Sequence, residues 1–493
     1  MFDFFSKKKF YNFAILILSV LLLNMACASK DDSEDEENIV TLLALLVASP
    51  WEQVKPSSDG NITIRNKTFR YQAKCSGHSF GGGSNSEFFY YIRRGDPKKL
   101  LINFMGGGSC FNQANCFGSN TTTYFNGLSQ LSPTAMKFVF GGGIFDNSKT
   151  TNPFSSYTVI FIPYCTGDLH WGSNDVVYSP TSNNFTGNTN PGGTFSHRGF
   201  DNTLSVLKDL QTSYPSPEKV FITGQSAGGY GAIFNSPYII EAMGGLGSTT
   251  DYAVVSDAAA GVTIANNNNF INSLWGVTAA FSKAGGGVFS NLPDWIPGIN
   301  DGVFNNLQLG DLVKSIAQAY PNVRFGQYTS ALDTTQAFFL NVTRIVRDQP
   351  VSYTNETTSS GGSDCSVLWG NANGLSGGDF AGCSSNATAP LISLWRNGGT
   401  DPKNGSTVIG MISQIVNLPV GVNNYSYYIA PGPSHTITMS SNFYSTSTNN
   451  RSLLDWYSAI ANKQQPSSVQ CNGESCLCGS GTDSNKCATA NSL

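Results

Sequence analysis

Phe221-Ile-Thr-Gly-Gln-Ser-Ala-Gly-Gly-Tyr230 carries the strongest structural signal in this sequence. An apolar run leads into Gly224-Gln-Ser-Ala-Gly228, a G-x-S-x-G pattern, and further small residues follow it. This order predicts a strand, a sharp turn and the start of a helix, with Ser226 at the tip of the turn. Glycine has no Cβ, so the strand and the helix can approach closely beside the serine. We therefore predict that Ser226 is a nucleophile; the alternative is a structural glycine-rich turn.

A serine hydroxyl needs a neighbouring base to act as a nucleophile, and the chain holds four histidines. In folds with this kind of elbow the chain order is serine, acid, histidine. His435 lies downstream of Ser226, just after the last predicted strand, and is the predicted base. His170 and His197 precede the serine and are predicted to be substrate-side or structural groups. His78 lies in a Gly/Ser-rich stretch and is predicted to be a loop residue.

The base needs a carboxylate to hold its tautomer, and two aspartates qualify. Asp333 follows the predicted strand 323–328, and Asp257 follows the predicted strand 252–255. Both lie where the ligand-facing residues of a parallel sheet collect. We favour Asp333, because it falls one strand before the loop that carries His435. Asp257 is the alternative acid, or else a structural or supporting group near the serine.

The oxyanion of an acyl-transfer reaction needs backbone donors. One is predicted to be the N–H of Ala227, directly after the nucleophile. The other is expected from the loop after an earlier strand, and Leu101-Ile-Asn-Phe-Met-Gly-Gly-Gly-Ser-Cys110 has that form. A phosphate-binding loop is the alternative reading of these glycines. It is disfavoured because no Gly-Lys-Ser/Thr follows.

Strand-like and helical segments alternate along the chain. The predicted strands are Phe88–Ile92, Leu100–Phe104, Thr158–Pro163, Lys219–Thr223, Tyr252–Val255, Val323–Tyr328 and Tyr425–Ala430, and His197–Ser213 has helical spacing. This alternation predicts an α/β fold with a mostly parallel central sheet flanked by helices. The stretch 261–320 interrupts it and is predicted to be either a cap over the site or a helical packing subdomain. Residues 355–386 are predicted to form a loop.

The first 27 residues have the layout of a signal peptide. A basic segment, 7–9, precedes an apolar run, 10–23, that is short for a membrane span. Ala26-Cys27 resembles a bacterial lipobox, in which the cysteine carries lipid, although Asn24 replaces the usual leucine. We predict export to the bacterial cell envelope with a lipid anchor, at the outer membrane or cell surface. The alternative is secretion after ordinary cleavage.

The rest of the chain divides by composition. Residues 28–50 are acidic and are predicted to form a solvated tether. Between 51 and 465 there is no long linker and no fixed-period repeat, so one large domain with insertions is predicted there. Residues 466–493 are predicted to form a Cys-rich tail.

Cysteine usage also indicates export. The chain has 11 cysteines, and ten remain if Cys27 is lipidated, which allows up to five disulfides in an oxidising compartment. Cys110 with Cys116, and Cys365 with Cys383, are spaced for local pairs. A terminal cluster comprises Cys471, Cys476, Cys478 and Cys487. Zinc binding by this cluster is the less favoured alternative, because no histidine lies nearby.

Charge argues against nucleic acid as a partner. Charged residues make up 12% of the chain and the net charge is −4, so there is no basic surface for phosphate contacts. A polar, weakly charged composition suits neutral ligands such as sugars. The sequence makes no prediction of oligomeric state.

Several motifs together resemble the pectin acetylesterase and Notum carboxylesterase family. They follow in family order over about 75–440. The matching pieces are Phe104-Met-Gly-Gly-Gly-Ser-Cys-Phe-Asn112, Ile162-Pro-Tyr-Cys-Thr-Gly-Asp168, His197-Arg-Gly-Phe200, Gly224-Gln-Ser-Ala-Gly-Gly-Tyr230, Leu332-Asp333 and Ser434-His435-Thr436. Family members usually carry a tryptophan in the glycine-rich loop beside the cysteine, where this chain has Ser109. That difference alters the expected pocket wall and leaves the substrate open.

The resemblance implies an α/β-hydrolase-like, cofactor-free and metal-free carboxylesterase. It implies Ser226, Asp333 and His435 as the catalytic triad, and it implies Gly107 and Gly108, with the Ala227 amide, as the oxyanion hole. The predicted reaction is hydrolysis of carboxylic esters, first of all O-acetyl groups on carbohydrate, through an acyl-enzyme. The alternatives are a non-catalytic surface lipoprotein that binds glycans or proteins, and a polyester or lipid deacylase with the same triad.

Overall fold

The structure is a computed structural model and describes residues 50–77, 86–111, 116–117, 123–124, 131–178, 181–182, 189–190, 193–263, 274–278, 290–348, 385–401, 405–417, 420–472 and 476. Several predicted features lie outside these residues. They are the signal peptide with Cys27, the acidic tether up to residue 49, the loop residue His78, nearly all of the predicted loop 355–386, and Cys365, Cys383, Cys478 and Cys487. Residues from Pro50 onward form one unit, which is described below.

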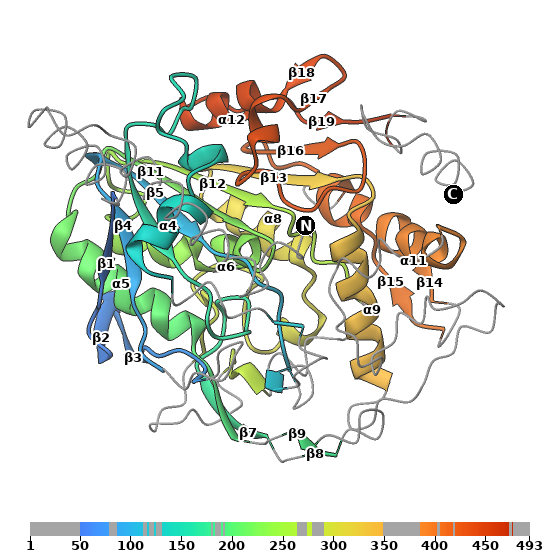
Figure 1. Cartoon of the computed structure of the whole chain (residues 1–493), viewed down its shortest axis with the longest axis horizontal. Helices are drawn as coiled ribbons and strands as arrows, with labels where there is room; N and C mark the ends of the chain where they lie inside the picture. Colours follow the sequence, from blue (N-terminus) through green and yellow to red (C-terminus); the bar gives the residue numbers. More distant parts are fainter. Residues whose placement is uncertain are drawn as a thin grey trace, which may run out of the picture. The chain divides into compact units, whose positions relative to one another are not determined.

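A nine-stranded sheet forms the centre of this unit (Figure 1). Its strand order is β1 (Trp51–Val54), β4 (Tyr90–Arg93), β6 (Tyr157–Ile162), β5 (Asp96–Phe104), β11 (Lys219–Gln225), β12 (Asp251–Asp257), β13 (Arg324–Ser330), β16 (Tyr425–Ala430) and β19 (Val469–Gln470). Neighbours pair in parallel except at β1–β4 and β4–β6. The predicted α/β fold with a mostly parallel sheet is confirmed.

Short two-stranded sheets lie outside the central sheet. They are β2 (Asp59–Ile64) with β3 (Lys67–Gln72), β7 (Asn174–Tyr178) with β10 (Gly193–His197), β8 (Thr181–Ser182) with β9 (Thr189–Asn190), β14 (Gly399–Thr400) with β15 (Thr407–Val408), and β17 (Ser447–Thr448) with β18 (Arg451–Ser452). The larger helices are α4 (Pro133–Val139), α5 (Gly199–Ser213), α6 (Ala227–Ala242), α8 (Leu309–Ala319), α9 (Thr334–Asp348), α11 (Ser385–Asn397) and α12 (Leu453–Ala461).

Alternate residues of the central strands build separate cores on the two faces of the sheet. Leu100 and Ile102 of β5 belong to the cluster that includes residues of α5, α6 and α8. Leu101 belongs to the other cluster, with residues of α4 and α12. Figure 1 shows α5 and α12 on opposite sides of the sheet. Successive side chains of a strand point to opposite faces, so apolar residues at every position bury both faces, as in covered parallel sheets.

Two boundaries differ from the sequence prediction. The helix predicted from His197 begins at Gly199, and His197 ends β10 instead. The start is set by a distant loop, because the Gly199 N–H donates to Asp168 Oδ2 at 2.7 Å. At the other end, the sheet continues past residue 465, since β19 lies in the predicted Cys-rich tail and pairs with β16.

Three disulfides lie in the described part of the chain. Cys110–Cys116 confirms the predicted local pair. Cys75–Cys165 joins positions 90 residues apart and was not predicted. Cys471–Cys476 lies within the predicted terminal cluster. Within the described residues, no helix combines the length and apolar character needed to cross a membrane.

Candidate active site

Ser226 occupies the sharp turn between β11 and α6. Its backbone has φ 55° and ψ −122°, a conformation that costs energy for a residue with a side chain. A Cβ on Gly228 would collide with the carbonyl oxygen of Phe104 in the neighbouring strand, and a Cβ on Gly224 would collide with Gly228. The two glycines therefore allow the close approach that presents the serine at the carboxyl edge of the sheet.

The glycine-rich loop after β5 lies against this elbow. A Cβ on Gly106 would collide with the carbonyl of Gln225 and lie 3.0 Å from the Ser226 Cβ. Gly108 has φ +76°, which a residue with a side chain rarely adopts. In the described part of the chain, no oxygen accepts a hydrogen bond from the N–H of Gly107 or Gly108. The Ala227 N–H lies in the first turn of α6, where amides lack an intrahelical acceptor.

His170 hydrogen-bonds to the start of this loop. It is not among the residues that line the cavity beside Ser226. Its Nε2 donates to the carbonyl of Met105 at 2.9 Å, directly before the three glycines. Burial lowers the pKa of His170 to about 4, and the bond to Met105 offsets only part of that shift. The ring is therefore neutral at neutral pH. Of the two roles predicted for His170, the structure places it in the structural one.

His435 lies in the loop after β16 and meets Asp333, which directly precedes α9. His435 Nδ1 lies 2.8 Å from Asp333 Oδ2 and 3.0 Å from Oδ1. Since a carboxylate only accepts, Nδ1 carries the proton and Nε2 is left as the basic nitrogen. Burial alone would lower the pKa of His435, but the charge and hydrogen bond of Asp333 outweigh it, and the pKa is raised above its usual value.

Gln336 holds the Asp333 carboxylate and was missed by the sequence reasoning. Its backbone N–H donates to Oδ1 at 2.9 Å and its side-chain Nε2 donates to Oδ2 at 2.8 Å. Its Oε1 accepts from the Ala260 N–H at 2.7 Å, which ties the acid to the loop after β12. The signal was present: Asp333-Thr-Thr-Gln336 has the spacing of a helix cap with a glutamine three residues on.

Asp257, the alternative acid, contacts the His435 loop but hydrogen-bonds to residues other than the imidazole. Its Oδ2 accepts from the N–H groups of Ile437 and Thr438, at 2.9 and 2.8 Å, and from the Thr438 hydroxyl at 2.6 Å. Its carboxyl is fully buried. The imidazole Nδ1 is already engaged by both oxygens of Asp333.

A cavity of about 110 Å³ opens beside Ser226. Ser226, Ala227, Gly108 and His435 all line it. Large apolar residues of its wall include Trp171, Trp275, Phe304, Leu312, Phe339 and Trp395. Several of these come from the stretch 261–320, whose described residues thus form part of the wall, as expected of a cap.

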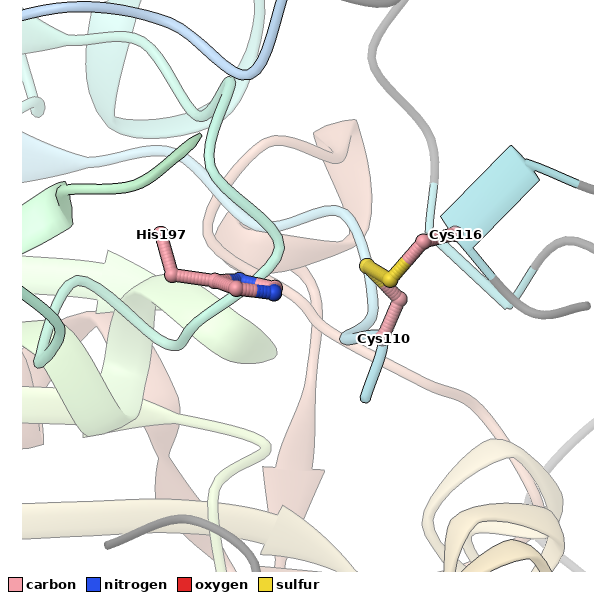
Figure 2. A group of neighbouring side chains, drawn as sticks. All are labelled: Cys110, Cys116 and His197. Atoms are coloured by element: carbon pink, nitrogen blue, oxygen red, sulfur yellow. A yellow bond between two sulfur atoms is a disulfide. The ribbon is translucent and has the colours of Figure 1, made fainter. Parts of the chain in front are cut away.

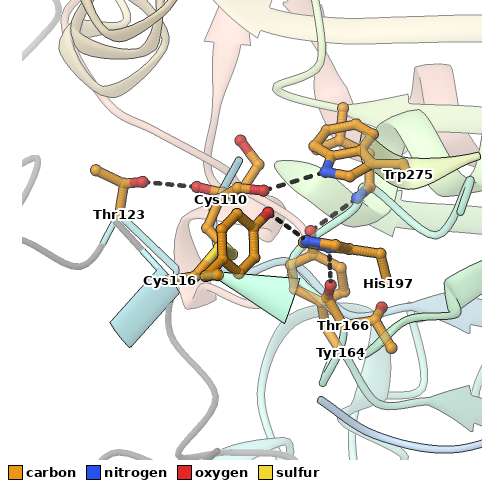
Figure 3. Close-up of a disulfide and its surroundings, with 10 residues drawn as sticks. Cys110, Cys116, Thr123, Tyr164, Thr166, His197 and Trp275 are labelled. Carbon is orange, nitrogen blue, oxygen red and sulfur yellow. Dashed lines mark hydrogen bonds between the residues drawn. A yellow bond between two sulfur atoms is a disulfide. The ribbon is translucent and has the colours of Figure 1, made fainter. Parts of the chain in front are cut away.

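Cys110, Cys116 and His197 form the one cluster of potential metal ligands in the described residues (Figure 2). Both sulfur atoms are joined in a disulfide, so neither is a thiolate. Figure 3 shows the His197 ring hydrogen-bonded to Thr166, through Nδ1 at 2.8 Å. Its Nε2 pairs with the Tyr178 hydroxyl at 3.0 Å. Both ring nitrogens are engaged, so His197 has a structural role and the oxidised cluster has no free ligand.

The same disulfide anchors the wall of the cavity. The Trp275 indole donates to the Cys110 carbonyl at 3.1 Å, and the Thr123 hydroxyl donates to the Ser109 carbonyl at 2.6 Å (Figure 3). Ser109, which stands where the resembling family usually has tryptophan, lines the cavity. The end of the glycine-rich loop is therefore hydrogen-bonded both to Trp275 and to Thr123.

Comparison with known proteins finds partial matches to one family of esterases. Residues 56–275 match the model of the family described as Pectinacetylesterase. Over this region the chain is similar to the pectin acetylesterase family. A palmitoleoyl-protein carboxylesterase NOTUM of Schmidtea mediterranea is 31% identical over 152 residues, which is 30% of this chain and 26% of the relative. The palmitoleoyl-protein carboxylesterase notum1a of Danio rerio is 28% identical over 163 residues, 32% of this chain and 29% of the relative.

The match with these relatives is partial. It spans between 26% and 29% of the length of the two curated relatives. A solved structure of the Wnt deacylase Notum from Drosophila aligns with a TM-score of 0.46 and 13% identity, over 84% of this chain and 96% of that chain. The family region contains the elbow and the glycine-rich loop, while Asp333 and His435 lie beyond residue 275.

Proposed function

We propose that the protein is a serine carboxylesterase, with Ser226 as nucleophile, His435 as base and Asp333 as acid. One observation carries the proposal. Ser226 and His435 line the same cavity, and the imidazole Nδ1 is hydrogen-bonded to the carboxylate oxygens of Asp333. Curated family members named as carboxylesterases support the same reaction class.

The proposed reaction proceeds through an acyl-enzyme. His435 Nε2 takes the Ser226 proton as Oγ attacks the ester carbonyl carbon, and the imidazolium is stabilised by Asp333. The N–H groups of Gly107, Gly108 and Ala227 stabilise the negative oxygen of the tetrahedral intermediate. The intermediate collapses when His435 gives its proton to the leaving alcohol. Water, activated by His435, then attacks the acyl-enzyme and releases the acid.

The acyl group is proposed from the wall of the cavity and from the family. The family name supports acetyl esters of carbohydrate, the substrate class first inferred from the sequence. The apolar wall supports a longer acyl chain as the second candidate, since one water-sized group takes only about 10–15 Å³ of such space and the cavity has about 110 Å³. The relatives named palmitoleoyl-protein carboxylesterases act on a long chain by name.

The experiment that tests the proposal is hydrolysis of p-nitrophenyl esters from acetate to palmitate, beside the Ser226→Ala variant. The variant should lower kcat by roughly 10⁵–10⁶-fold, because the nucleophile is absent. The chain-length optimum separates the two acyl candidates. A Ser226→Ala protein that keeps near-full activity excludes the proposed nucleophile. A folded wild type that neither hydrolyses any ester nor reacts at Ser226 with a fluorophosphonate probe favours the binding-protein alternative.

Export with a lipid anchor is proposed on separate grounds. Three disulfides in the described residues are typical of proteins that fold outside the cytoplasm. The anchor at Cys27 is supported by the Ala26-Cys27 pattern alone. Radiolabelled palmitate should be incorporated by the full chain and not by Cys27→Ser. Equal labelling of both proteins excludes Cys27 as the site.

A further inference from the structure

Asp257 is a buried carboxyl group that the proposed reaction does not use, yet it contacts both catalytic loops. Its backbone carbonyl accepts from the Ser226 N–H at 2.7 Å, at the nucleophile elbow. Its side chain accepts three hydrogen bonds from Ile437 and Thr438, which follow His435 by two and three residues. Asp257 thus hydrogen-bonds both to the proposed nucleophile and to the loop that carries the proposed base.

Thr438 extends this contact to the oxyanion loop. Its hydroxyl, which donates to Asp257, accepts from Gln225 Nε2 at 2.9 Å. Gln225 directly precedes Ser226, and its Nε2 also donates to Asn103 Oδ1 at 2.8 Å. Asn103 lies near the end of β5, three residues before the glycine-rich loop. One hydrogen-bonded network therefore joins the ends of β5, β11 and β12 to the His435 loop.

The buried state of Asp257 is costly, which argues that its bonds matter. Its Oδ1 has no hydrogen-bond partner among the described residues. Burial raises the pKa of Asp257, while the bonds from Thr438 and Ile437 favour the ionised form. Hydrogen bonds to a charged acceptor are roughly twice as strong as neutral ones, so the carboxylate holds the two amides more firmly than an amide side chain would.

We propose that Asp257 is a positioning residue that, through Ile437 and Thr438, holds the His435 loop in register with the nucleophile elbow. This proposal rests on the proposed esterase function for its kinetic consequence. Its structural consequence is independent of activity. A displacement of about 1 Å between base and nucleophile can cost roughly 100-fold in rate. The expected signature is therefore a loss of kcat with little change in KM.

The titratable groups near Asp257 do not change the interpretation of a kinetic test of this proposal. They are Tyr328 on β13, Tyr457 on α12 and His435. Burial raises the pKa of both tyrosines well above the usual value, so both stay neutral in an assay between about pH 6 and pH 9. Kinetic comparison at the pH plateau of each variant then separates positioning from a change in the His435 protonation state.

The kinetic experiment compares Asp257→Asn with Asp251→Asn in the full, disulfide-intact protein. Asp251 is the matched control, because it is a partly buried carboxylate at the opposite end of β12, bonded to Arg324 at 2.6 Å. Asp257→Asn should lower kcat roughly 10- to 100-fold on p-nitrophenyl butyrate with KM within about twofold. Asp251→Asn should lower the denaturation midpoint and keep kcat. An Asp257→Asn protein that behaves like Asp251→Asn overturns the proposal.

A second pair of variants, at Thr438, leaves Asp257 itself unchanged. These variants test the proposal even if Asp257→Asn does not fold. Thr438→Val removes the hydroxyl that joins Asp257 to Gln225, and Thr438→Ser restores it. Thr438→Val should lose kcat and Thr438→Ser should regain most of it. Equal kcat in the two variants overturns the proposal.

Hydrogen exchange tests whether Asp257 holds the Ile437 and Thr438 amides, and this test needs no esterase activity. In Asp257→Asn the peptide spanning 433–440 should take up deuterium faster, because the Ile437 and Thr438 amides exchange a charged acceptor for a weaker, neutral amide oxygen. In Asp251→Asn this peptide should exchange as in the wild type. Unchanged exchange in Asp257→Asn overturns the positioning role of Asp257. Faster exchange in a protein that hydrolyses no ester supports this role and counts only against the proposed function.

Discussion

At the residue scale, the site depends on which carboxylate meets the imidazole. Asp257 ends β12 and Asp333 follows the neighbouring parallel strand β13, and both lie close to the His435 loop. They differ in what they accept. Asp333 accepts the His435 Nδ1 proton, and Asp257 accepts backbone amides two and three residues further on. Substitutions of the two residues should therefore lower kcat by different amounts.

Replacing Asp333 by asparagine should lower kcat by about 10⁴-fold, because an amide can leave His435 in the wrong tautomer. The measurement is steady-state hydrolysis of a p-nitrophenyl ester at the optimal pH. Asp257→Asn, with its smaller expected loss, is the comparison. If Asp257→Asn loses 10⁴-fold and Asp333→Asn does not, the assignment of the acid is wrong.

Replacing Gln336 by methionine should lower kcat roughly 10-fold and move the acidic limb of kcat/KM to higher pH. The variant removes the Nε2 donor to Asp333, so more of the carboxylate charge acts on His435 and raises its pKa further. Gln327→Met is the matched control. Gln327 is also buried, and it bonds to Ala259 and Tyr425 instead.

The pH profile and the denaturation midpoint distinguish the two variants. Both should be destabilised by loss of buried hydrogen bonds, by roughly 1–3 kcal/mol. Only Gln336→Met should move the acidic limb. An unmoved limb in Gln336→Met would mean that Gln336 serves stability alone.

At the scale of elements, the sheet presents every proposed catalytic group at the carboxyl ends of its strands. The glycine-rich loop follows β5, Ser226 follows β11, Asp333 follows β13 and His435 follows β16. Parallel strands bring these ends to one edge, where ligands bind in open α/β sheets. Disulfides then fasten the connections around this edge, one over a long span and one locally.

The two disulfides should contribute unequally to stability. Cys75–Cys165 closes a span of 90 residues and Cys110–Cys116 a span of 6. By the loop-closure relation, the double serine variant of the first pair should lose about 4–5 kcal/mol and that of the second about 2 kcal/mol. Urea unfolding of both double variants measures this difference. Equal losses would contradict the entropic account.

At the scale of the whole molecule, two fully buried neutral histidines make stability sensitive to acid. Burial lowers the pKa of His197 to about 3 and that of His170 to about 4, despite their hydrogen bonds to carbonyl groups. The usual pKa in an unfolded chain is about 6.5. Below that pH the unfolded chain binds protons that the folded chain does not, so stability falls as the pH falls.

Replacing His197 by asparagine should make the free energy of unfolding less dependent on pH. The asparagine amide can still donate to Thr166, but it binds no proton. Between about pH 4 and pH 6 the slope should fall by about 1.4 kcal/mol per pH unit relative to wild type. Denaturant titrations at several pH values give the slope.

His435→Asn is the control for that slope. The folded-state pKa of His435 is raised, so in this range the ring is protonated both folded and unfolded. The stability that its raised pKa contributes is present below about pH 6.5 and is lost only as the pH rises through the folded value. The slope should therefore not change in His435→Asn. A His197→Asn slope equal to wild type would mean that His197 is not buried neutral.

The sequence by itself determined the features that depend on local pattern. G-x-S-x-G after an apolar run predicts a strand, turn and helix, because only glycine permits the close packing at Gly224 and Gly228. The alternation of apolar strands with helices predicts a parallel sheet, and the sheet is present. The chain order of Ser226, Asp333 and His435 narrowed the site to a few residues, but it left two acids open.

Only the tertiary structure decided what depends on contacts between distant residues. It brings Asp333 to the His435 imidazole and Asp257 to the amides beyond it, a choice that strand order alone does not make. It also sets the start of α5, because the cap comes from Asp168, some thirty residues earlier in the chain. The physical reason is the same in each case: a buried polar group must find a partner, and the fold determines which partner lies within reach.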